Sequence, residues 1–220
     1  RVQGIVQMYF AGEAAGEAVA LLLSGKRNFS GRLAETFPVR YEDNPAWPYY
    51  AKEPDRLVYG EGIRTGYRYY DGGKVAPRFA FRYGLSYTSF SYSRVTCRRG
   101  GDGVVCRDVR NTGGCDGAET VMLFVGKPFA GSPVRELVGF DKVEIPAGEE
   151  RCVRIRVALA DLAVWDERVH AFVIPQGEYR FSFCDGSARV AARADCEIIS
   201  GYCGREEQLG RSAAVPAAGI

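Results

Sequence analysis

The sequence predicts a mainly β fold, in which an immunoglobulin-like antiparallel sandwich follows a β-α unit and a long connector. Three observations support this prediction. From Leu85 onward, apolar and polar residues alternate with the period of two that half-buried strands show. Turn residues separate these segments, and about seven strands in about 115 residues is typical of such a sandwich. Near the start of the chain, an apolar run is followed by a helical pattern.

The chain opens with an apolar run, GIVQMYFAG (residues 4–12), which ends in glycine as a buried strand of a parallel sheet does. In the next segment, apolar residues recur at the spacing of one helix face: Ala15, Ala18, Val19, Leu22 and Leu23. Gly25 is placed to end this helix. A parallel strand needs neighbours on both sides and helices on both faces, so we expect most of an α/β domain to precede residue 1. We interpret residues 1–38 as the remnant of that domain.

Residues 39–84 read as an inter-domain connector, because the chain loses periodicity and is rich in Pro, Gly, Tyr and Asp. Connectors longer than about 15 residues are usually functional or wrapped over another domain. Aromatic residues favour wrapping, since their rings bury large areas while one edge stays polar. These residues are Trp47, Tyr49, Tyr50, Tyr67, Tyr69 and Tyr70. The densest stretch, EGIRTGYRYYDGG (residues 61–73), leaves a second interpretation open, because Tyr and Arg side chains also line glycan sites.

Residues 85–198 carry the alternating pattern of the sandwich. In CVRIRV (residues 152–157) valine and isoleucine alternate with arginine, and in EYRFSF (residues 178–183) aromatic residues alternate with Arg180 and Ser182. The segments RNTGG, IPAGEE, IPQGEY and CDGS supply Pro, Gly, Asn and Asp where the backbone reverses. These patterns predict half-buried antiparallel strands joined by tight turns.

Few residues of this half suggest chemistry. We expect Trp165, in LAVWDE, to fill the core of the sandwich. The adjacent carboxylates of Asp166 and Glu167 could suggest a catalytic pair, but neighbouring residues of a strand point to opposite faces, so we assign them a structural role. His170 is the only histidine, and its place near a turn indicates an ordinary edge residue.

The cysteines do not form a recognisable site. Their spacing contains no C-x-x-C pair and favours reduced thiols over a metal site. The positions are Cys97, Cys106, Cys115, Cys152, Cys184, Cys196 and Cys203. Because phosphate-binding glycine motifs are also missing from the sequence, we predict no metal and no cofactor.

Charge and hydropathy indicate which partners to expect. The 29 basic and 27 acidic residues are spread over all 220 positions, so we expect no basic face and no nucleic-acid partner. We expect no membrane partner either, because the longest apolar run, residues 18–23, is far shorter than the roughly 20 residues that span a bilayer. The chain begins with Arg1 and shows no signal-peptide pattern, so we expect a piece of a longer protein. Cytoplasmic and secreted locations both stay open.

Several motifs in order resemble the C-terminal stretch of glycoside hydrolase family 3 enzymes, typified by β-glucosidases. They are GEAVALLLSGKRNFSGRLAETFP, DNPA, VYGEGIRTGYRYYD, FRYGLSYTSF, ELVGFDKVEIPAGE, WDE and GEYRF, and they cover about residues 4–190. The resemblance implies a (β/α)₈ barrel and an α/β sandwich domain upstream, followed by a fibronectin type III-like domain at residues 85–198. It also implies that residues 58–71 lie between the last two domains and hold them together.

The same resemblance implies a retaining glycosidase, which needs two carboxylates about 5 to 5.5 Å apart. Both are expected outside this chain, the nucleophile in the barrel and the acid/base in the part of the α/β sandwich domain that would precede residue 1. We therefore predict no catalytic residue in this chain and no activity for the isolated chain, while substrate-binding residues stay unknown. The expected partners are the barrel and sandwich domains and, through them, a β-glycoside. The alternative is a non-catalytic fibronectin type III-like module for binding or adhesion.

Three positions depart from the family pattern. Arg82, in FRYGLSY, stands where the family usually has a glycine, and it would strain the loop if that position has a positive φ. Phe29 and Ala34 stand where prolines are common. Residues 199–220 lie beyond the usual end of the family and are polar, small and unpatterned, so we expect a tail or a linker.

Overall fold

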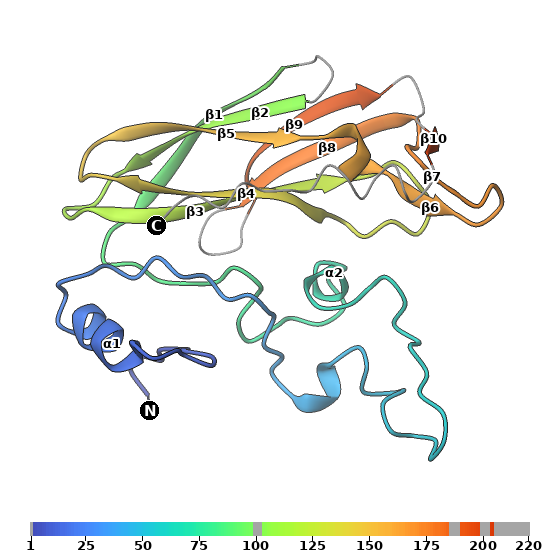
Figure 1. The fold of residues 1–220 in the computed structure, drawn as a ribbon, viewed down its shortest axis with the longest axis horizontal. Helices are drawn as coiled ribbons and strands as arrows, with labels where there is room; N and C mark the ends of the chain where they lie inside the picture. Colours follow the sequence, from blue (N-terminus) through green and yellow to red (C-terminus); the bar gives the residue numbers. More distant parts are fainter. Residues whose placement is uncertain (1, 99–102, 185–189, 199–202, 205–220) are drawn as a thin grey trace.

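The structure is a computed structural model that describes residues 2–98, 103–184, 190–198 and 203–204, with side chains at residues 2–93 and 107–184. Figure 1 shows two layers, a β-sandwich and, beneath it, a layer built mostly from irregular chain. The lower layer contains α1 (Ala15–Leu23), a 3-10 turn (Tyr41–Asp43) and α2 (Tyr67–Tyr70). No helix of the described part combines the length and apolar character that crossing a bilayer requires.

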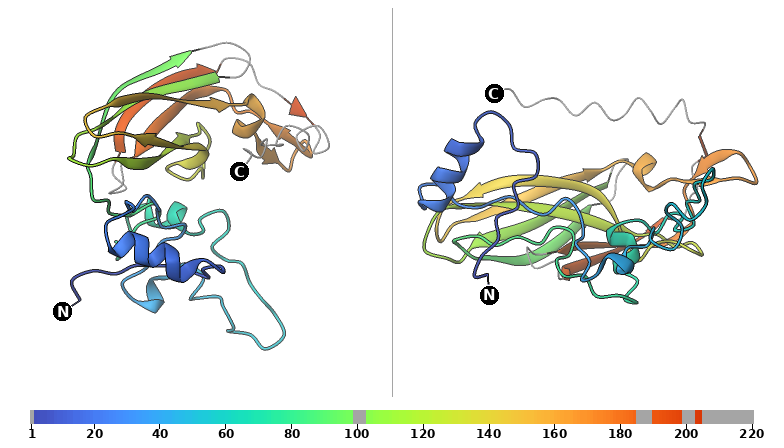
Figure 2. Two further views of the ribbon diagram at one scale, coloured as in Figure 1. Left: turned by 60° about the vertical axis from the view of Figure 1, so that its left-hand side comes forward. Right: turned by 90° about the horizontal axis from the view of Figure 1, so that it is seen from below.

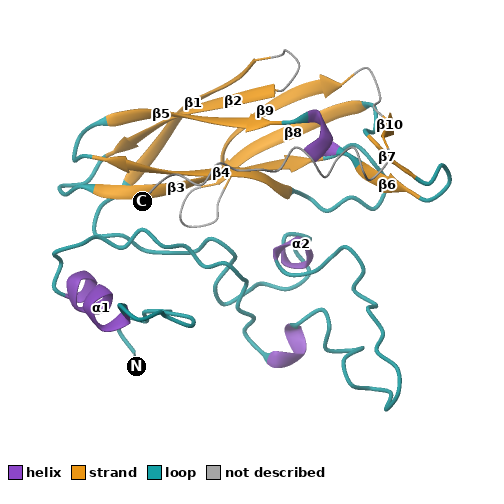
Figure 3. Ribbon diagram, in the orientation of Figure 1, coloured by secondary structure: helices purple, strands orange, loops and turns teal. Residues whose placement is uncertain are grey.

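The upper layer contains the strands. They are β1 (Phe90–Arg98), β2 (Gly103–Asn111), β3 (Gly117–Gly126), β4 (Glu136–Ile145), β5 (Glu150–Val157), β6 (Val164–Asp166), β7 (Ala171–Val173), β8 (Gly177–Cys184), β9 (Val190–Ile198) and β10 (Cys203–Gly204). A 3-10 turn (Leu159–Leu162) precedes β6. Figure 3 shows the contrast between this strand-rich layer and the loops below it.

The strands form two facing antiparallel sheets, ordered β1-β2-β5 and β4-β3-β8-β9, and a small separate ribbon, β10-β7-β6. The three- and four-stranded sheets confirm the predicted sandwich. Of the predicted tail, residues 203–204 form β10 and pair with β7, and the rest lies outside the described residues.

The core lies between the two sheets and follows the alternation of the sequence. On β5, Val153, Ile155 and Val157 are buried, while the side chains at positions 154 and 156 are exposed, as predicted. They meet a cluster from the other strands: Val109, Val121, Leu123, Val125, Ile145, Leu162, Ile174, Tyr179, Phe181 and Phe183. Burial of these apolar side chains is the main source of stability in this half.

Two turns show how the predicted turn residues work. In RNTGG, the fully buried Asn111 side chain donates to the carbonyls of Cys115 and Ile145, each at 2.9 Å, and ties two loops together. In IPQGEY, the Tyr179 hydroxyl donates to the Pro175 carbonyl at 2.6 Å, the arrangement known as a tyrosine corner. Burial raises the pKa of Tyr179 to about 12, so this hydroxyl stays protonated at neutral pH.

Trp165 is not in the core, and that prediction was wrong. Its side chain is 46% exposed and lies on the small ribbon, opposite Phe172, with the two ring centroids 5.2 Å apart. The ribbon extends beyond the facing sheets (Figure 1), so no second sheet covers it. Leu162 and Ile174, at its base, are buried instead.

The predicted strand at residues 4–12 is also absent. A strand needs a neighbour to accept its backbone hydrogen bonds, and no described segment pairs with these residues. Their apolar side chains are exposed, among them Ile5 at 70%. The helix that follows does form, as α1, which ends at Leu23 and is followed by Ser24 and by Gly25, whose φ is +73°. None of its side chains is buried, and Figure 2 shows α1 apart from the sheets.

Candidate functional site

The candidate site is the seam where the lower layer meets the outer face of the β4-β3-β8-β9 sheet. Two segments of the lower layer run antiparallel to each other, residues 31–37 and residues 78–84. Their pairing makes the contact between the lower layer and the sheet possible. The Arg82 N–H donates to the Leu33 carbonyl at 2.8 Å, and the Phe37 N–H donates to the Phe79 carbonyl at the same distance. At Gly84 an added Cβ would lie 2.7 Å from the Gly31 carbonyl oxygen, so only glycine allows the two segments to approach this closely.

Aromatic rings of the connector pack on the sheet. Tyr67 of α2 stacks on Phe81 with a centroid distance of 4.8 Å and meets the edge of Phe124 from β3 at 5.8 Å. The Tyr67 hydroxyl accepts a hydrogen bond of 2.8 Å from the Leu137 N–H of β4. Tyr70 is buried, and its hydroxyl donates to the Asp43 carbonyl at 3.0 Å. The geometry therefore favours the connector's role in holding parts together over sugar stacking by these two rings.

The seam explains why burial on β8 departs from strict alternation. Tyr179, Phe181 and Phe183 face the core, as predicted, but Ser182 and Cys184 are buried as well. Neighbouring residues of a strand face opposite sides, so these two lie on the outer face of the sheet. The lower layer covers that face, so the expectation of an exposed Ser182 was wrong.

Four side chains form what we call the Arg82–Arg135 cluster: Asp71, Arg82, Arg135 and Cys184. The Arg135 guanidinium donates to both carboxylate oxygens of Asp71, at 2.6 and 2.9 Å, and also to the Cys184 sulfur. The Arg82 guanidinium donates to the Cys184 carbonyl. The two arginine side chains also lie over the Phe124 ring, at 5.7 Å (Arg82) and 4.8 Å (Arg135) from its centroid. This cluster joins the connector to β8, to the residue that precedes β4 and, through the Phe124 ring, to β3.

Arg82 has the positive φ that the family glycine suggested, +75°. A non-glycine residue in this region is strained, as the sequence argument anticipated. The side chain is nevertheless only 1% exposed, because it is built into the seam. The other two residues that depart from the family pattern also make contacts. Phe29 packs against the Tyr87 ring, and the Ala34 N–H, which proline would lack, donates to the Tyr9 hydroxyl.

A second buried polar group links the lower layer to the sandwich interior. Arg32 pairs with Glu119 of β3, and both side chains are almost completely buried. The Tyr92 hydroxyl of β1 donates to the same carboxylate at 2.5 Å. Burial, reinforced by the charge on Glu119, raises the pKa of Tyr92, so its hydroxyl remains a donor. Arg107 lies over the Tyr92 ring, 4.8 Å from its centroid, and burial lowers its pKa.

Asn28 holds three segments at one point. Its amide donates to the Asp116 carbonyl at 3.0 Å, and its oxygen accepts from the Ser86 hydroxyl and the Tyr87 N–H at 2.9 and 2.8 Å. The sequence analysis missed Asn28, Arg32 and Glu119 as contact residues. The visible signal was Glu119, a carboxylate at a position that the alternation assigns to the core.

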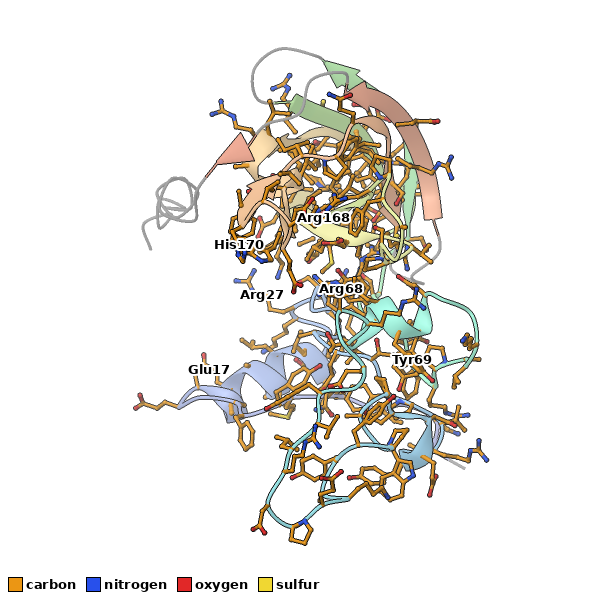
Figure 4. The ribbon with its side chains drawn as sticks, turned by 90° about the vertical axis from the view of Figure 1, so that its right-hand side faces the viewer. Glu17, Arg27, Arg68, Tyr69, Arg168 and His170 are labelled. Atoms are coloured by element: carbon orange, nitrogen blue, oxygen red, sulfur yellow. The ribbon has the colours of Figure 1, made fainter. Side chains whose placement is uncertain are left out.

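Two hollows of about 230 and 210 Å³ border the stacked side chains of Tyr67 and Phe81. Both are lined by Thr36, Tyr67, Tyr70 and Phe81. Arg135 and Asp71 border one of them and Asn44 borders the other. Figure 4 labels Arg68 and Tyr69, which lie between Tyr67 and Tyr70 on α2.

The residues first considered for catalysis lie apart from the seam. Asp166 pairs with the exposed Arg168 at 2.7 Å, and hydrogen bonds from Arg168 lower the pKa of Asp166 to about 2. His170 is exposed, has a φ of +48° and lies 6.5 Å from the Trp165 ring, and Figure 4 places it with Arg168 on the sandwich. Among the described side chains, no three His, Cys, Asp or Glu residues group as metal ligands.

The described thiols differ in exposure. Cys115 and Cys152 are exposed, and Cys184 is buried. The side chains at the four other cysteine positions lie outside the described ones.

Comparison with family models divides the chain in two. Residues 1–87 match the glycosyl hydrolase family 3 C-terminal domain, and residues 119–187 match the fibronectin type III-like domain. The first model ends just after the seam segment 78–84, and the second begins at Glu119 on β3.

Known relatives align with most of this chain, but the aligned stretch is only a small part of their own length. A probable β-glucosidase I from Emericella nidulans is 39% identical over 192 residues, which is 81% of this chain and 23% of the relative. The thermostable β-glucosidase B of Acetivibrio thermocellus is 37% identical over 186 residues, 81% of this chain and 25% of the relative. The chain thus spans about a quarter of the length of the curated relatives it matches.

Solved structures agree. β-Glucosidase 3B from Thermotoga neapolitana superposes with a TM-score of 0.82 and 33% identity, over 89% of this chain and 28% of that one. A family 3 β-glucosidase from Bifidobacterium adolescentis superposes with a TM-score of 0.81 and 34% identity, over 88% and 29%. With both family models in their expected order, the chain belongs to glycoside hydrolase family 3 and matches the C-terminal region of β-glucosidases.

Proposed function

We propose that this chain is the C-terminal portion of a retaining β-glucosidase-like hydrolase, that it supports the catalytic domains, and that it lacks the catalytic carboxylates. One observation supports this proposal most strongly. Relatives named as β-glucosidases match four fifths of this chain but only about a quarter of themselves. Most of each relative therefore lies outside the matched stretch. That unmatched length can hold the domains that would act on a glycoside.

Three described carboxylates, two at the seam and one on the ribbon, are engaged in ion pairs and do not offer a catalytic pair. A retaining glycosidase needs one free carboxylate as nucleophile and one protonated carboxyl group as acid, about 5 to 5.5 Å apart. Glu119 is paired with Arg32, Asp71 with Arg135, and Asp166 with Arg168. Asp166, with a pKa of about 2, stays ionised at neutral pH and cannot serve as the acid.

The proposed supporting role follows from the seam and from the exposed N-terminal residues. We divide the chain into an α/β remnant (residues 1–38), a connector (residues 39–84), a fibronectin type III-like domain (residues 85–198) and a tail or linker (residues 199–220). The seam holds the first two units against the third through buried ion pairs and aromatic contacts. The exposed apolar side chains of residues 2–10 suit the upstream barrel and sandwich domains as partners.

The test compares the 220-residue chain with a longer chain that includes the coding region upstream of Arg1. We expect no hydrolysis of an aryl β-glucoside by the 220-residue chain above a buffer blank, and clear turnover by the longer chain. Turnover by the short chain that survives repurification would contradict the missing carboxylate pair. An upstream region without a barrel would instead favour the alternative, a free-standing binding module.

A further inference from the structure

The interior along the seam holds more guanidinium groups than carboxylates. Arg32 is matched by Glu119 and Arg135 by Asp71, each through a direct ion pair. Arg82 is buried as deeply, but its described hydrogen bond goes to a neutral carbonyl. Its Nε and Nη1 atoms have no hydrogen-bond partner among the described atoms. A buried cation without a counter-charge is strongly unfavourable, so a negative charge is needed near Arg82.

Cys184 is the group placed to supply that charge. It is fully buried at the end of β8, its carbonyl accepts from Arg82, and its sulfur accepts from Arg135. The same two guanidinium groups lie over the ring of Phe124, so the sulfur has cations near it in an otherwise apolar place. Neighbouring guanidinium groups favour the thiolate over the thiol, whereas burial alone would favour the neutral thiol.

We propose that Cys184 is a thiolate in the folded chain, that it neutralises Arg82, and that it is a reaction site for soft electrophiles which the docked connector shields. Ionising an ordinary thiol, whose pKa is about 8.5, is a smaller penalty at neutral pH than leaving a guanidinium unpaired in the interior. The proposal concerns the chain itself and does not depend on glycosidase activity.

Several titratable groups face the cluster. Burial lowers the pKa of Arg82, and an ionised Cys184 is the group that would oppose this shift most, ahead of Tyr92 and Glu119. Burial would also lower the pKa of Arg135, but the Asp71 hydrogen bond and then Cys184 outweigh it and raise that pKa. The remaining titratable group that acts on the cluster is Tyr67 of the connector.

Shielding follows from the position of Asp71. This residue belongs to the connector and holds Arg135 over Cys184 with two hydrogen bonds. When the α2 segment that carries Asp71 moves away, the sulfur becomes accessible, while Arg82 stays held by its hydrogen bonds to the Leu33 and Cys184 carbonyls and still favours the thiolate. The thiolate can then attack a reagent such as iodoacetamide, forming an S–C bond as the C–I bond breaks and iodide leaves.

The first experiment measures ionisation. The ultraviolet absorbance of thiolate is recorded from about pH 5 to pH 9 for the natural chain and for Cys184→Ser, and the two titrations are subtracted. We expect the absorbance difference to correspond to one thiolate at neutral pH. As the pH is lowered, this thiolate should become protonated with a midpoint below about pH 7. A difference that appears only above about pH 8 shows an ordinary thiol and overturns the proposal.

Arg82→Gly provides a second measurement if the serine variant does not fold. It removes the cation, restores the residue usual in the family and keeps Cys184. We expect the thiolate midpoint to rise by at least about one pH unit. The matched control is Arg168→Ala, which removes an exposed arginine of the ribbon and leaves the midpoint unchanged. An unchanged midpoint in Arg82→Gly overturns the pairing of Arg82 with Cys184.

The second experiment measures shielding. Trypsin releases residues 181–189 as FSFCDGSAR, in which Cys184 is the only cysteine, so its labelling by iodoacetamide can be followed by mass. We expect Asp71→Asn to increase its labelling rate about tenfold, because the connector opens more often. Asp166→Asn is the matched control on the exposed ribbon, and Cys115, already exposed, is the internal standard. Equal Cys184 rates in both variants would show that the connector does not shield it.

Discussion

The two layers of the molecule are held together by different interactions. The sandwich has a continuous apolar core between its sheets. In the lower layer, residues 2–84, Tyr70 is the only hydrophobic residue that is buried. The lower layer is instead fastened to the sandwich by the Arg82–Arg135 cluster, the Arg32–Glu119 pair and the hydrogen bonds of Asn28.

This difference teaches that the lower layer is not a folding unit by itself. A segment that buries so little apolar surface cannot offset the conformational entropy lost on folding, so its order depends on the neighbour that it docks on. Its own apolar side chains, such as Ile5, Phe10 and Leu23, face outward and are available for a second neighbour. The predictions below test this contrast.

The largest expected effect is on association. We expect the 220-residue chain to self-associate, because residues 2–23 expose several large apolar side chains. A chain that begins at Lys26 keeps the whole seam and should be monomeric. Sedimentation of both chains at matched concentration is the measurement. If both are monomers, the exposed N-terminal surface has no adhesive role and the contrast between the layers is weaker than stated.

The next effect compares equivalent substitutions in the two layers. Phe183 is fully buried in the core, so Phe183→Ala should reduce the free energy of unfolding by about 3 to 5 kcal/mol. Phe10 is fully exposed, so Phe10→Ala should change it by less than about 0.5 kcal/mol. The effect of Phe183→Ala is measured by urea unfolding of the chain that begins at Lys26. The effect of Phe10→Ala is measured by urea unfolding of the full chain, which contains that residue. Similar losses at both sites would mean that residues 2–10 are packed in solution.

A third substitution tests the link between the layers. Glu119→Ala leaves Arg32 unpaired in the interior and should cost about 3 kcal/mol. Glu149→Ala removes the exposed pair with Arg151 and should cost no more than about 1 kcal/mol. Denaturant unfolding gives both free energies. Hydrogen exchange at residues 31–37 should rise in Glu119→Ala, and no change there would show that the lower layer docks independently of this pair.

The smallest effect is a pH dependence on the ribbon. The folded-state pKa of Asp166, about 2, is lower than the ordinary value of about 3.9, so its ionised form stabilises the folded chain. That contribution is present above about pH 4 and is lost as the pH falls through about 2. Asp166→Asn should remove this small acid-dependent step from thermal unfolding curves recorded between these pH values. A step that persists in the variant must come from other carboxylates.

Local periodicity predicted the parts of the fold whose environment is set nearby in the sequence. The alternation in residues 152–157 identifies which side chains of β5 are buried, and the turn residues mark where the strands reverse. The helical spacing before Gly25 predicts α1 correctly. The order of motifs also led to glycoside hydrolase family 3, which the family models confirm.

Contacts between distant segments decided the rest, because no periodicity encodes them. Trp165 has a strand pattern typical of the core, but its ribbon has no facing sheet. Residues 4–12 are apolar enough for a buried strand, but no described neighbour pairs with them. Ser182 and Cys184 are buried by the lower layer, through contacts such as Arg82 with Cys184, 102 positions apart. The sequence by itself determined the strands of the sandwich, the helix and the family, and only the tertiary structure determined which outer faces are covered, since that depends on where the connector docks.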